Sequence, residues 1–219
     1  NNSKDYGIFE SSYKVKKFAN KLKDCVCLIL GCTREQLEDR EFKEKELGEE
    51  WKIWEVFEGV GKRPTIIGTE EDAKKLCIEI WGEFIEPYAK TKILTPRKLL
   101  QLLGTDCGRD IIHPNIWVNA LMSNYKTSTF MLDNGVQARG VKFPDWIITD
   151  VRFPNELKAI EDRKGITIRV NTNRAGILSS HLSETSLDNA KFDYIIDNSG
   201  TIEELVEKVR EILIKENII

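Results

Sequence analysis

Two charged side chains follow a short apolar run in the second half of the chain, where they could bind a phosphorylated ligand. Asp150 and Arg152 come directly after the run 146–148, which has the character of a buried strand. Ligands of open parallel sheets bind beyond the carboxyl ends of the strands, so both side chains could face one cleft. There the Asp150 carboxylate could hold Mg²⁺ through water, and the Arg152 guanidinium could bind a phosphate. The spacing equally allows a structural arrangement, in which Asp150 caps the following helix and Arg152 pairs with Glu156.

A second candidate is a helical segment that places a cation and an amide on one face. Arg97 and Gln101 lie four residues apart after Thr95-Pro96, a pair typical of a helix start. Leucines occupy the opposite face, so an ordinary amphipathic helix explains this segment when it is considered alone. A third candidate is Arg174, on a loop that could close over a bound triphosphate or simply carry a solvated charge. Neither histidine has a serine or cysteine partner at a recognisable spacing, which argues against a hydrolytic triad.

The elements that position these residues follow from apolar periodicity and from helix-end signals. In the second half of the chain, strand and helix patterns alternate, which predicts an α/β fold with a parallel sheet covered by helices. Gly31 is expected to end the first helix, and Gly104 to end the helix that begins at Thr95. The charged stretch 38–52 is expected to be a solvated, mobile segment. We predict helices over residues 13–30, 33–37, 69–88, 95–103, 114–125, 154–164 and 202–215, and strands over residues 146–148, 166–170 and 194–196.

Composition limits the class of protein. The chain has 219 residues, with 33 Lys and Arg against 36 Asp and Glu, so its net charge of −3 would attract neither a nucleic-acid polymer nor an anionic membrane. No apolar run approaches the length of a transmembrane helix and no secretory signal is visible, so a cytoplasmic protein is expected. The five cysteines lack metal-site spacing and are interpreted as reduced thiols. Since there are no repeats and no flexible linker, we expect a single domain over residues 1–219.

Four segments carry a more specific signal when they are read together. They are KKFANKLKDCVCLILG (residues 16–31), TPRKLLQLLGTDCGRDIIHPNIWVNAL (95–121), TDVRFPNELKAIEDRKGITIRV (149–170) and HLSETSLDNAKFDYIIDNSGTIEEL (181–205). The ordered set resembles the deoxynucleoside monophosphate kinases of tailed bacteriophages, the family typified by the T-even phage enzyme. The resemblance implies a P-loop kinase fold, in a phage protein of the host cytoplasm. It also implies transfer of the γ-phosphoryl group of ATP to a deoxynucleoside monophosphate with Mg²⁺.

The resemblance also implies roles for individual residues. On the acceptor side, Arg97 would contact the phosphate, and Trp117 would stack near the base or form a wall of the pocket. At the reaction centre, Asp150 and Arg152 would act together, oriented by Glu156. The other implied site residues are Gln101, Gly104, Thr105 and Asp106 lining the acceptor pocket, Lys23 near the phosphates, Arg174 as a lid arginine, and Asn198 and Gly200 in the turn that borders the adenine.

One feature of the family does not occur in this sequence. It has no G-x-x-x-x-G-K-[ST] motif, and the nearest likeness, Gly61-Lys62, has Val56 in place of the first glycine and Arg63 in place of Ser or Thr. In the family this motif precedes the segment that matches residues 16–31. Because the first residue is also not Met, we expect that the first strand and the phosphate-binding loop have been cut off and that this chain alone is inactive. Two alternative functions stay open. The chain could be a catalytically inactive nucleotide-binding module, or another kinase of the same fold that acts on dephospho-coenzyme A. A homodimer is also possible.

Overall fold

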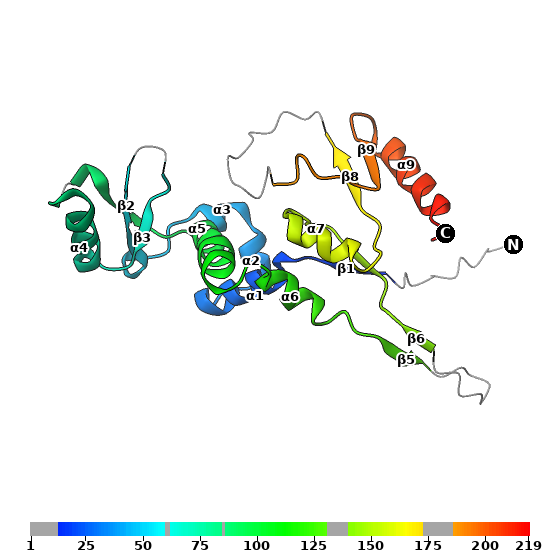
Figure 1. Ribbon diagram of the computed structural model, residues 1–219, viewed down its shortest axis with the longest axis horizontal. Coiled ribbons are helices and arrows are strands. Elements are labelled where there is room, and N and C mark those ends of the chain that lie inside the picture. Colours follow the sequence, from blue (N-terminus) through cyan, green and yellow to red (C-terminus); the bar gives the residue numbers. More distant parts are fainter. Residues whose placement is uncertain (1–12, 60–61, 85, 131–139, 173–185) are drawn as a thin grey trace, which may run out of the picture. The chain divides into compact units, whose positions relative to one another are not determined.

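A computed structural model describes residues 13–59, 62–84, 86–130, 140–172 and 186–219. The chain divides into two compact units. We call the unit formed by Asn1–Ala19 and Asn115–Ile219 the parallel unit, and the unit formed by Asn20–Pro114 the inserted unit. Each has its own strands, helices and hydrophobic core (Figure 1). The single domain expected from the sequence stays a prediction.

The parallel unit contains two pairs of parallel strands. β1 (Lys14–Lys16) pairs with β7 (Trp146–Ile148), and β8 (Ile168–Asn171) pairs with β9 (Tyr194–Asp197). In the part of the chain that the structure describes, β7 has only β1 as a strand neighbour and β8 has only β9. Parallel pairing with helices between the strands confirms the predicted α/β class.

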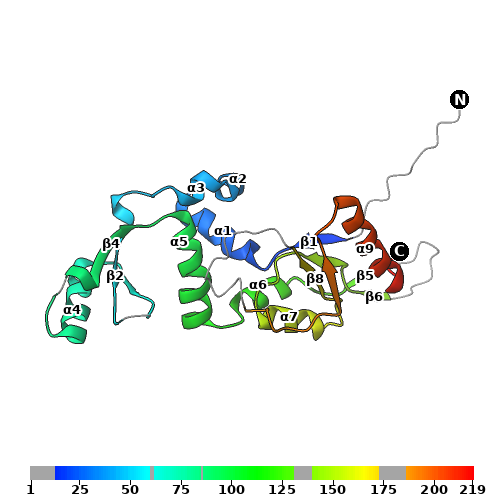
Figure 2. The same cartoon turned by 90° about the horizontal axis from the view of Figure 1, so that it is seen from above.

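Among the described residues, the parallel unit contains the helices α6 (Ile116–Met122), α7 (Pro154–Glu161) and α9 (Ile202–Lys215). The bounds of α9 are those predicted, because Thr201 and Glu204 form a capping box at its start. This helix lies beside β9 (Figure 2). The unit also contains an antiparallel pair that the sequence did not reveal, formed by β5 (Ser128–Phe130) and β6 (Gly140–Lys142).

The core of the parallel unit fixes the chain where it leaves β1. Its buried members are Phe18, Val118, Leu121 and Ala159, against which Trp146, Ile148 and neighbouring apolar side chains pack. Phe18 is only 1% exposed and lies between β1 and the next helix. Burying an aromatic side chain of this size contributes about 2 to 3 kcal/mol, so this position is firmly held. It is also the position that Asp150 contacts, as described below.

The inserted unit is built around an antiparallel sheet of order β3-β2-β4. Its central strand β2 (Lys52–Val56) pairs with β3 (Thr65–Ile67) and with β4 (Ala89–Ile93). Helix α4 (Glu70–Trp81) packs on this sheet (Figure 1). The buried side chains between them are Val56, Ala73, Cys77 and Ala89. None of these three strands was predicted.

Other helices complete the inserted unit. They are α1 (Ala19–Leu30), of which only the first residue belongs to the parallel unit, α2 (Arg34–Glu38), α3 (Arg40–Glu44), α5 (Pro96–Gln101) and a π-helix (Leu102–Ile112). The predicted starts at Thr33 and Thr95 are confirmed, since each side chain accepts a hydrogen bond from a backbone N–H three residues later. None of the helices in the described ranges has the length and apolar character that a bilayer crossing requires.

Some predicted boundaries were wrong. Lys14–Lys16, expected to begin the first helix, form β1, because their backbone pairs with β7 and Val15 lies opposite Ile147. The charged stretch 38–52 contains α3 and a 3₁₀ turn at Glu49–Trp51. Asp39 starts α3 by accepting a hydrogen bond from the N–H of Phe42 at 2.7 Å, a cap hidden among the other charges. The helix predicted over residues 69–88 already ends at Trp81.

Gly104 does not end a helix, contrary to the prediction. The chain continues through it in the π-helix Leu102–Ile112. A Cβ atom at Gly104 would lie 2.8 Å from Cδ2 of Leu22, closer than real contacts allow. The glycine therefore permits close packing against α1, and its signal in the sequence was mistaken for a helix stop.

Candidate functional site

The predicted site residues fall into two groups, one in each unit. The parallel unit contains Trp117, Asp150, Arg152, Glu156, Asn198 and Gly200. The inserted unit contains Lys23, Arg97, Gln101, Gly104, Thr105 and Asp106. Arg174, the predicted lid arginine, lies outside the residues that the structure describes, as does His181.

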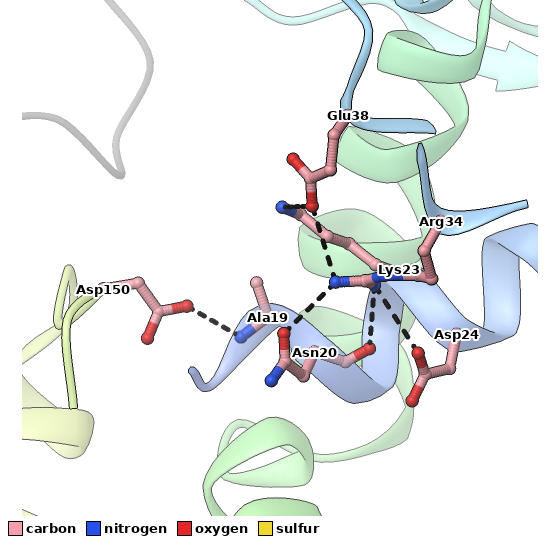
Figure 3. A network of polar contacts seen from close by, with 7 residues as sticks. All are labelled: Ala19, Asn20, Lys23, Asp24, Arg34, Glu38 and Asp150. Carbon is pink, nitrogen blue, oxygen red and sulfur yellow. Dashed lines mark hydrogen bonds and ion pairs between the residues drawn. The ribbon is translucent and has the colours of Figure 1, made fainter. Parts of the chain in front are cut away.

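Asp150 lies just after β7, and its carboxylate binds the start of α1 (Figure 3). Its Oδ1 accepts a hydrogen bond from the backbone N–H of Phe18 at 2.8 Å, and its Oδ2 accepts one from Ala19 at 3.0 Å. A helix N-terminus presents unpaired N–H groups and partial positive charge, and both favour a carboxylate. Asp150 therefore does cap a helix, but this helix is α1, whose first residue lies 131 positions earlier, and not the helix that follows.

The Asp150 carboxylate retains capacity for a water-mediated Mg²⁺ contact. Each carboxylate oxygen can accept about two hydrogen bonds, so the two backbone contacts leave lone pairs for water. Mg²⁺ in nucleotide sites keeps several waters and takes only one or two carboxylates, with phosphates as further ligands. Among the described residues, no three His, Cys, Asp or Glu side chains form a cluster that could hold a metal ion. A single carboxylate with ligand phosphates is thus the arrangement that fits here.

Glu156 holds the backbone at Arg152. Its Oε2 accepts hydrogen bonds from the N–H groups of Arg152 at 2.8 Å and Phe153 at 3.2 Å. Glu156 is 2% exposed, and a carboxylate so deeply buried is stable only when such donors compensate for its lost hydration. Arg152 itself is exposed. The structure therefore brings Glu156 to the main chain of Arg152. The predicted role of Glu156 in orienting Asp150 and Arg152 for the reaction stays a prediction.

Trp117 lies near the start of α6, where an amide pair joins this helix to α7. Trp117 is 6% exposed and lies in α6, beside the core residue Val118. At the start of α6, the Oδ1 of Asn115 accepts a hydrogen bond from Nδ2 of Asn155 at 2.8 Å. This amide pair links the first turns of α6 and α7. The stacking role implied for Trp117 stays a prediction.

Asn198 and Gly200 lie in the turn that follows β9. The backbone N–H of Asn198 continues the strand pairing by donating to the carbonyl of Asn171 at 2.8 Å. Glu204 reaches back over the turn, and its Oε2 accepts a hydrogen bond from the N–H of Thr201 at 3.2 Å. A Cβ atom at Gly200 would lie 1.8 Å from that oxygen, so the small residue leaves room for the capping carboxylate. The implied adenine contact of this turn stays a prediction.

In the inserted unit, Lys23 belongs to a polar network along α1 and α2 (Figure 3). Nζ of Lys23 lies 2.6 Å from Oε1 of Glu38, and Nη2 of Arg34 lies 3.4 Å from the same oxygen. Arg34 also donates hydrogen bonds to the side chain and carbonyl of Asn20 and pairs with Asp24. The hydrogen bond from Lys23 holds the pKa of Glu38 below its usual value. One carboxylate therefore joins two cations at this place.

Arg97, like Lys23, is paired with a carboxylate side chain. Its Nε donates a hydrogen bond to Oε1 of Glu44 on α3, and both side chains are about half exposed. The next residue, Lys98, lies 3.6 Å from the carboxylate of Glu55. Glu55 is only 4% exposed and also pairs with Lys92 at 2.8 Å. The exposed pair of Arg97 can exchange with a ligand, whereas the buried carboxylate of Glu55 anchors the neighbouring lysine to the sheet.

The remaining predicted acceptor residues lie along α5 and the π-helix. Gln101 ends α5 and is half-buried, and Thr105 is 7% exposed. Asp106 lies 3.7 Å from Nη1 of Arg63. Widened π-type turns are rare and are found frequently at functional sites. The structure thus supplies an unusual backbone at Gly104 to Asp106, although their contact with an acceptor stays a prediction.

Several residues of these clusters were missed from the sequence. They are Arg34, Glu38, Glu44 and Glu55. Arg34 and Glu38 had a usable signal, since a capping box predicted their helix and their spacing of four predicts an ion pair. Glu44 had none, because it is one of many acidic residues in a charged stretch.

Comparisons with known proteins agree with the resemblance found in the sequence. Residues 66–209 match the family model of deoxynucleotide monophosphate kinase. A protein of Acanthamoeba polyphaga mimivirus, provisionally named deoxynucleotide monophosphate kinase, is 34% identical over 125 residues, which cover 52% of this chain and 59% of the relative. Deoxynucleotide monophosphate kinase of Escherichia phage RB69 is 27% identical over 117 residues, or 53% of this chain and 44% of the relative.

A further relative is deoxynucleoside-5'-monophosphate kinase of Escherichia phage T5. It is 28% identical over 156 residues, which cover 64% of this chain and 55% of the relative. The chain therefore spans about half the length of the curated relatives it matches. The matched range of the family model contains the predicted clusters around Arg97 and around Asp150 and Arg152.

Proposed function

The chain belongs to the deoxynucleotide monophosphate kinase family, and from this premise we propose that the protein transfers the γ-phosphoryl group of ATP to a deoxynucleoside monophosphate. The observation that carries the proposal is the family match over residues 66–209. This range contains both candidate sites that the residue spacing suggested, Arg97 with Gln101 and Asp150 with Arg152. ATP and a small nucleotide are the ligands, and the host cytoplasm, where both occur, is the proposed location.

Arg97 is the proposed contact of the acceptor phosphate. Its guanidinium already binds an anion, the carboxylate of Glu44. A phosphate monoester carries more charge and offers the same paired oxygen acceptors, so it can replace Glu44 at this position. Gln101, Thr105 and Asp106 follow along the same helical segment and would contact the rest of the nucleotide. Their exact contacts depend on which base is bound.

Lys23 and Arg34 supply a second cationic position in the same unit. Their shared partner Glu38 accepts from Lys23 at 2.6 Å and lies 3.4 Å from Arg34. We assign Lys23 to a phosphate of the nucleotides, with Glu38 holding its ammonium group in place until the ligand binds. The exposed fraction of the Lys23 side chain is 21%, so the group is partly desolvated and its charge attracts a phosphate more strongly than that of a fully solvated lysine.

At the reaction centre, Arg152 is the proposed ligand of the transferring phosphoryl group. Glu156 fixes the backbone of Arg152, so the guanidinium starts from a defined position. Asp150 would hold Mg²⁺ through water, and the bound ion would supply charge neutralisation at the phosphates. No general base is required, because the acceptor is already an anionic phosphate. Arg174 would close over the phosphates, and the turn with Asn198 and Gly200 would border the adenine.

The test is a coupled enzymatic assay that measures ADP formation. The protein assayed is the one encoded by the complete reading frame. ATP and Mg²⁺ are combined with dGMP, dTMP, dCMP or dephospho-coenzyme A, and the phosphorylated product is identified by chromatography. We expect ADP formation that depends on a deoxynucleoside monophosphate and yields the diphosphate. Turnover of dephospho-coenzyme A alone would show a different kinase of this fold. Deoxynucleotide binding without turnover would show an inactive binding module.

A further inference from the structure

The C-terminal end of α1 brings together two cysteines that the proposed function does not use. Gly31, directly after the helix, has a φ of 63°, which is the left-handed region. The backbone N–H of Cys32 donates a hydrogen bond to the carbonyl of Cys27 at 3.1 Å. A left-handed glycine together with this hydrogen bond across six residues is the Schellman helix end. In that motif the side chains of the two bonded residues commonly contact each other, and here both are thiols.

The two thiols are neighbours and differ from the third cysteine of the segment. Cys27 and Cys32 are both half-buried, and the backbone hydrogen bond between them makes the two residues neighbours. Burial, and then the hydrogen bond to the Cys32 thiol, raise the pKa of Cys27 above its usual value. Cys25 is exposed, and residues two positions apart point to different sides of a helix. The helix end therefore selects one pair among three cysteines.

We propose that Cys27 and Cys32 form a reversible disulfide, which makes the end of α1 a redox-sensitive modification site. The co-reactant is a small disulfide such as oxidised glutathione. The thiolate of one cysteine attacks it, forming a mixed disulfide and releasing one glutathione thiolate. The second cysteine then attacks the protein sulfur of that mixed disulfide and releases the second glutathione. The two cysteines lose two electrons, the glutathione disulfide gains them, and the two thiol protons end on the two glutathione thiols.

The cross-link would hold a helix end that is already folded. The Schellman hydrogen bond already brings Cys27 and Cys32 together in the reduced protein. Lys23 lies one helical turn before Cys27, so the linked segment adjoins a proposed phosphate contact. The disulfide itself does not rest on the proposed function, and it can be measured without a kinase assay.

The first experiment identifies the linked pair in the whole chain. Reduced protein is incubated with oxidised glutathione at mildly alkaline pH, its free thiols are alkylated, and the tryptic peptide 24–34 is analysed by mass spectrometry. This peptide contains Cys25, Cys27 and Cys32. We expect it to lack the mass of two hydrogen atoms and to carry one alkyl group, on Cys25. Dithiothreitol should restore three alkylated cysteines.

Three serine variants provide the controls. Cys25→Ser is the matched control on the same helix and should close as the unchanged protein does. Cys27→Ser and Cys32→Ser should stop at a mixed disulfide with glutathione. Closure should also raise the melting temperature of the unchanged protein and of Cys25→Ser, relative to their reduced forms. A disulfide that includes Cys25, a linkage between two chains, or a mixed disulfide as the end product of the unchanged protein would overturn the proposal.

Discussion

The two units hold their proposed site residues in different ways. In the parallel unit, the carboxylates of Asp150 and Glu156 accept hydrogen bonds from backbone N–H groups, and each fixes the start of a helix. In the inserted unit, Lys23 and Arg97 are held by carboxylate side chains that are about half exposed. Backbone donors have fixed positions, whereas exposed ion pairs exchange readily with water and with other ions.

Under the proposed function, this difference would suit two separate tasks of phosphoryl transfer. The groups at the transferring phosphoryl need a preorganised geometry, which backbone hydrogen bonds provide. The groups that receive a substrate must release their resident partners when it arrives. Substitutions in the parallel unit should therefore change turnover or stability strongly, and those in the inserted unit should change binding by smaller amounts.

The largest effect is expected for Arg152→Ala. Turnover should fall by roughly a hundredfold or more, the scale observed when a preorganised donor is lost from a transition state. Arg152→Lys should restore little of it, because lysine lacks the paired geometry of guanidinium. The coupled assay on the product of the complete reading frame measures both. Normal turnover combined with an earlier unfolding transition would instead show that Arg152 has a structural role.

Glu156→Ala should mainly reduce stability. The change removes the acceptor of two backbone N–H groups at the start of α7, and it should lower the free energy of unfolding by about 2 to 3 kcal/mol. Urea unfolding at neutral pH provides the measurement. Glu161→Ala, at an exposed position of the same helix, is the matched control and should change stability by less than about 0.5 kcal/mol. Equal effects of the two variants would contradict the anchoring role of Glu156.

Arg97→Ala should weaken binding of the deoxynucleoside monophosphate by about 2 kcal/mol, near the lower end for truncated charge pairs because the site is half exposed. Binding of an ATP analogue should hardly change. Isothermal titration with each ligand separates the two affinities. Equal weakening of both affinities would place Arg97 at the donor nucleotide or in a structural role. Unchanged binding of the acceptor would show that the helix with Arg97 is an ordinary amphipathic helix without a binding role.

Acid should destabilise the parallel unit through Asp193. Hydrogen bonds from the hydroxyl and the backbone N–H of Thr167, at 2.7 and 2.8 Å, hold the pKa of Asp193 below its usual value. A carboxyl whose pKa is lower in the folded state stabilises the fold above its unfolded pKa, near 4, and loses this contribution as the pH falls through the folded value. Because Asp193 is exposed and solvent screens its carboxylate, unfolding measured between neutral and acidic pH should show a loss of less than about 1 kcal/mol that Asp193→Asn lacks. An unchanged pH profile in that variant would exclude the contribution.

The smallest effect is expected for Glu44→Gln. Removing the charge that competes for Arg97 should tighten binding of the deoxynucleoside monophosphate about two- to threefold, since exposed ion pairs contribute roughly 0.5 kcal/mol. Isothermal titration against the unchanged protein is again the measurement. Glu41→Gln on the same helix serves as the control and should leave the affinity unchanged. If both variants bind equally well, the acceptor phosphate does not displace Glu44.

The sequence predicted those features that depend on near neighbours. The capping box at Thr33 and the start at Thr95 need only residues three positions away, and both were confirmed. The helix over residues 202–215 was also confirmed, from its apolar periodicity. β1 could not be found in this way, because Val15 becomes a strand residue only when it lies opposite Ile147. The strands β2 to β4 likewise depend on pairing across a long stretch of chain. The role of Gly104 in close helix packing could not be predicted, because it depends on the distant residue Leu22.

The same distinction applies to the candidate site. Asp150 and Arg152 were identified from a rule about strand ends, which needs only the local pattern. The partner that Asp150 contacts could not be predicted, because Phe18 and Ala19 are more than a hundred residues away in the sequence. Glu44 could not be predicted as the partner of Arg97 for another reason, since nothing local distinguishes one exposed acidic residue from its neighbours.

The strand pairs of the parallel unit have a consequence for folding. β1 pairs with β7, and the register joins Lys14 to Trp146 and Lys16 to Ile148. β1 therefore forms only when segments more than a hundred residues apart in the sequence meet. Closing so long a loop carries a larger entropic cost than forming a local helix, so this strand pair should form later in folding than the locally capped helices.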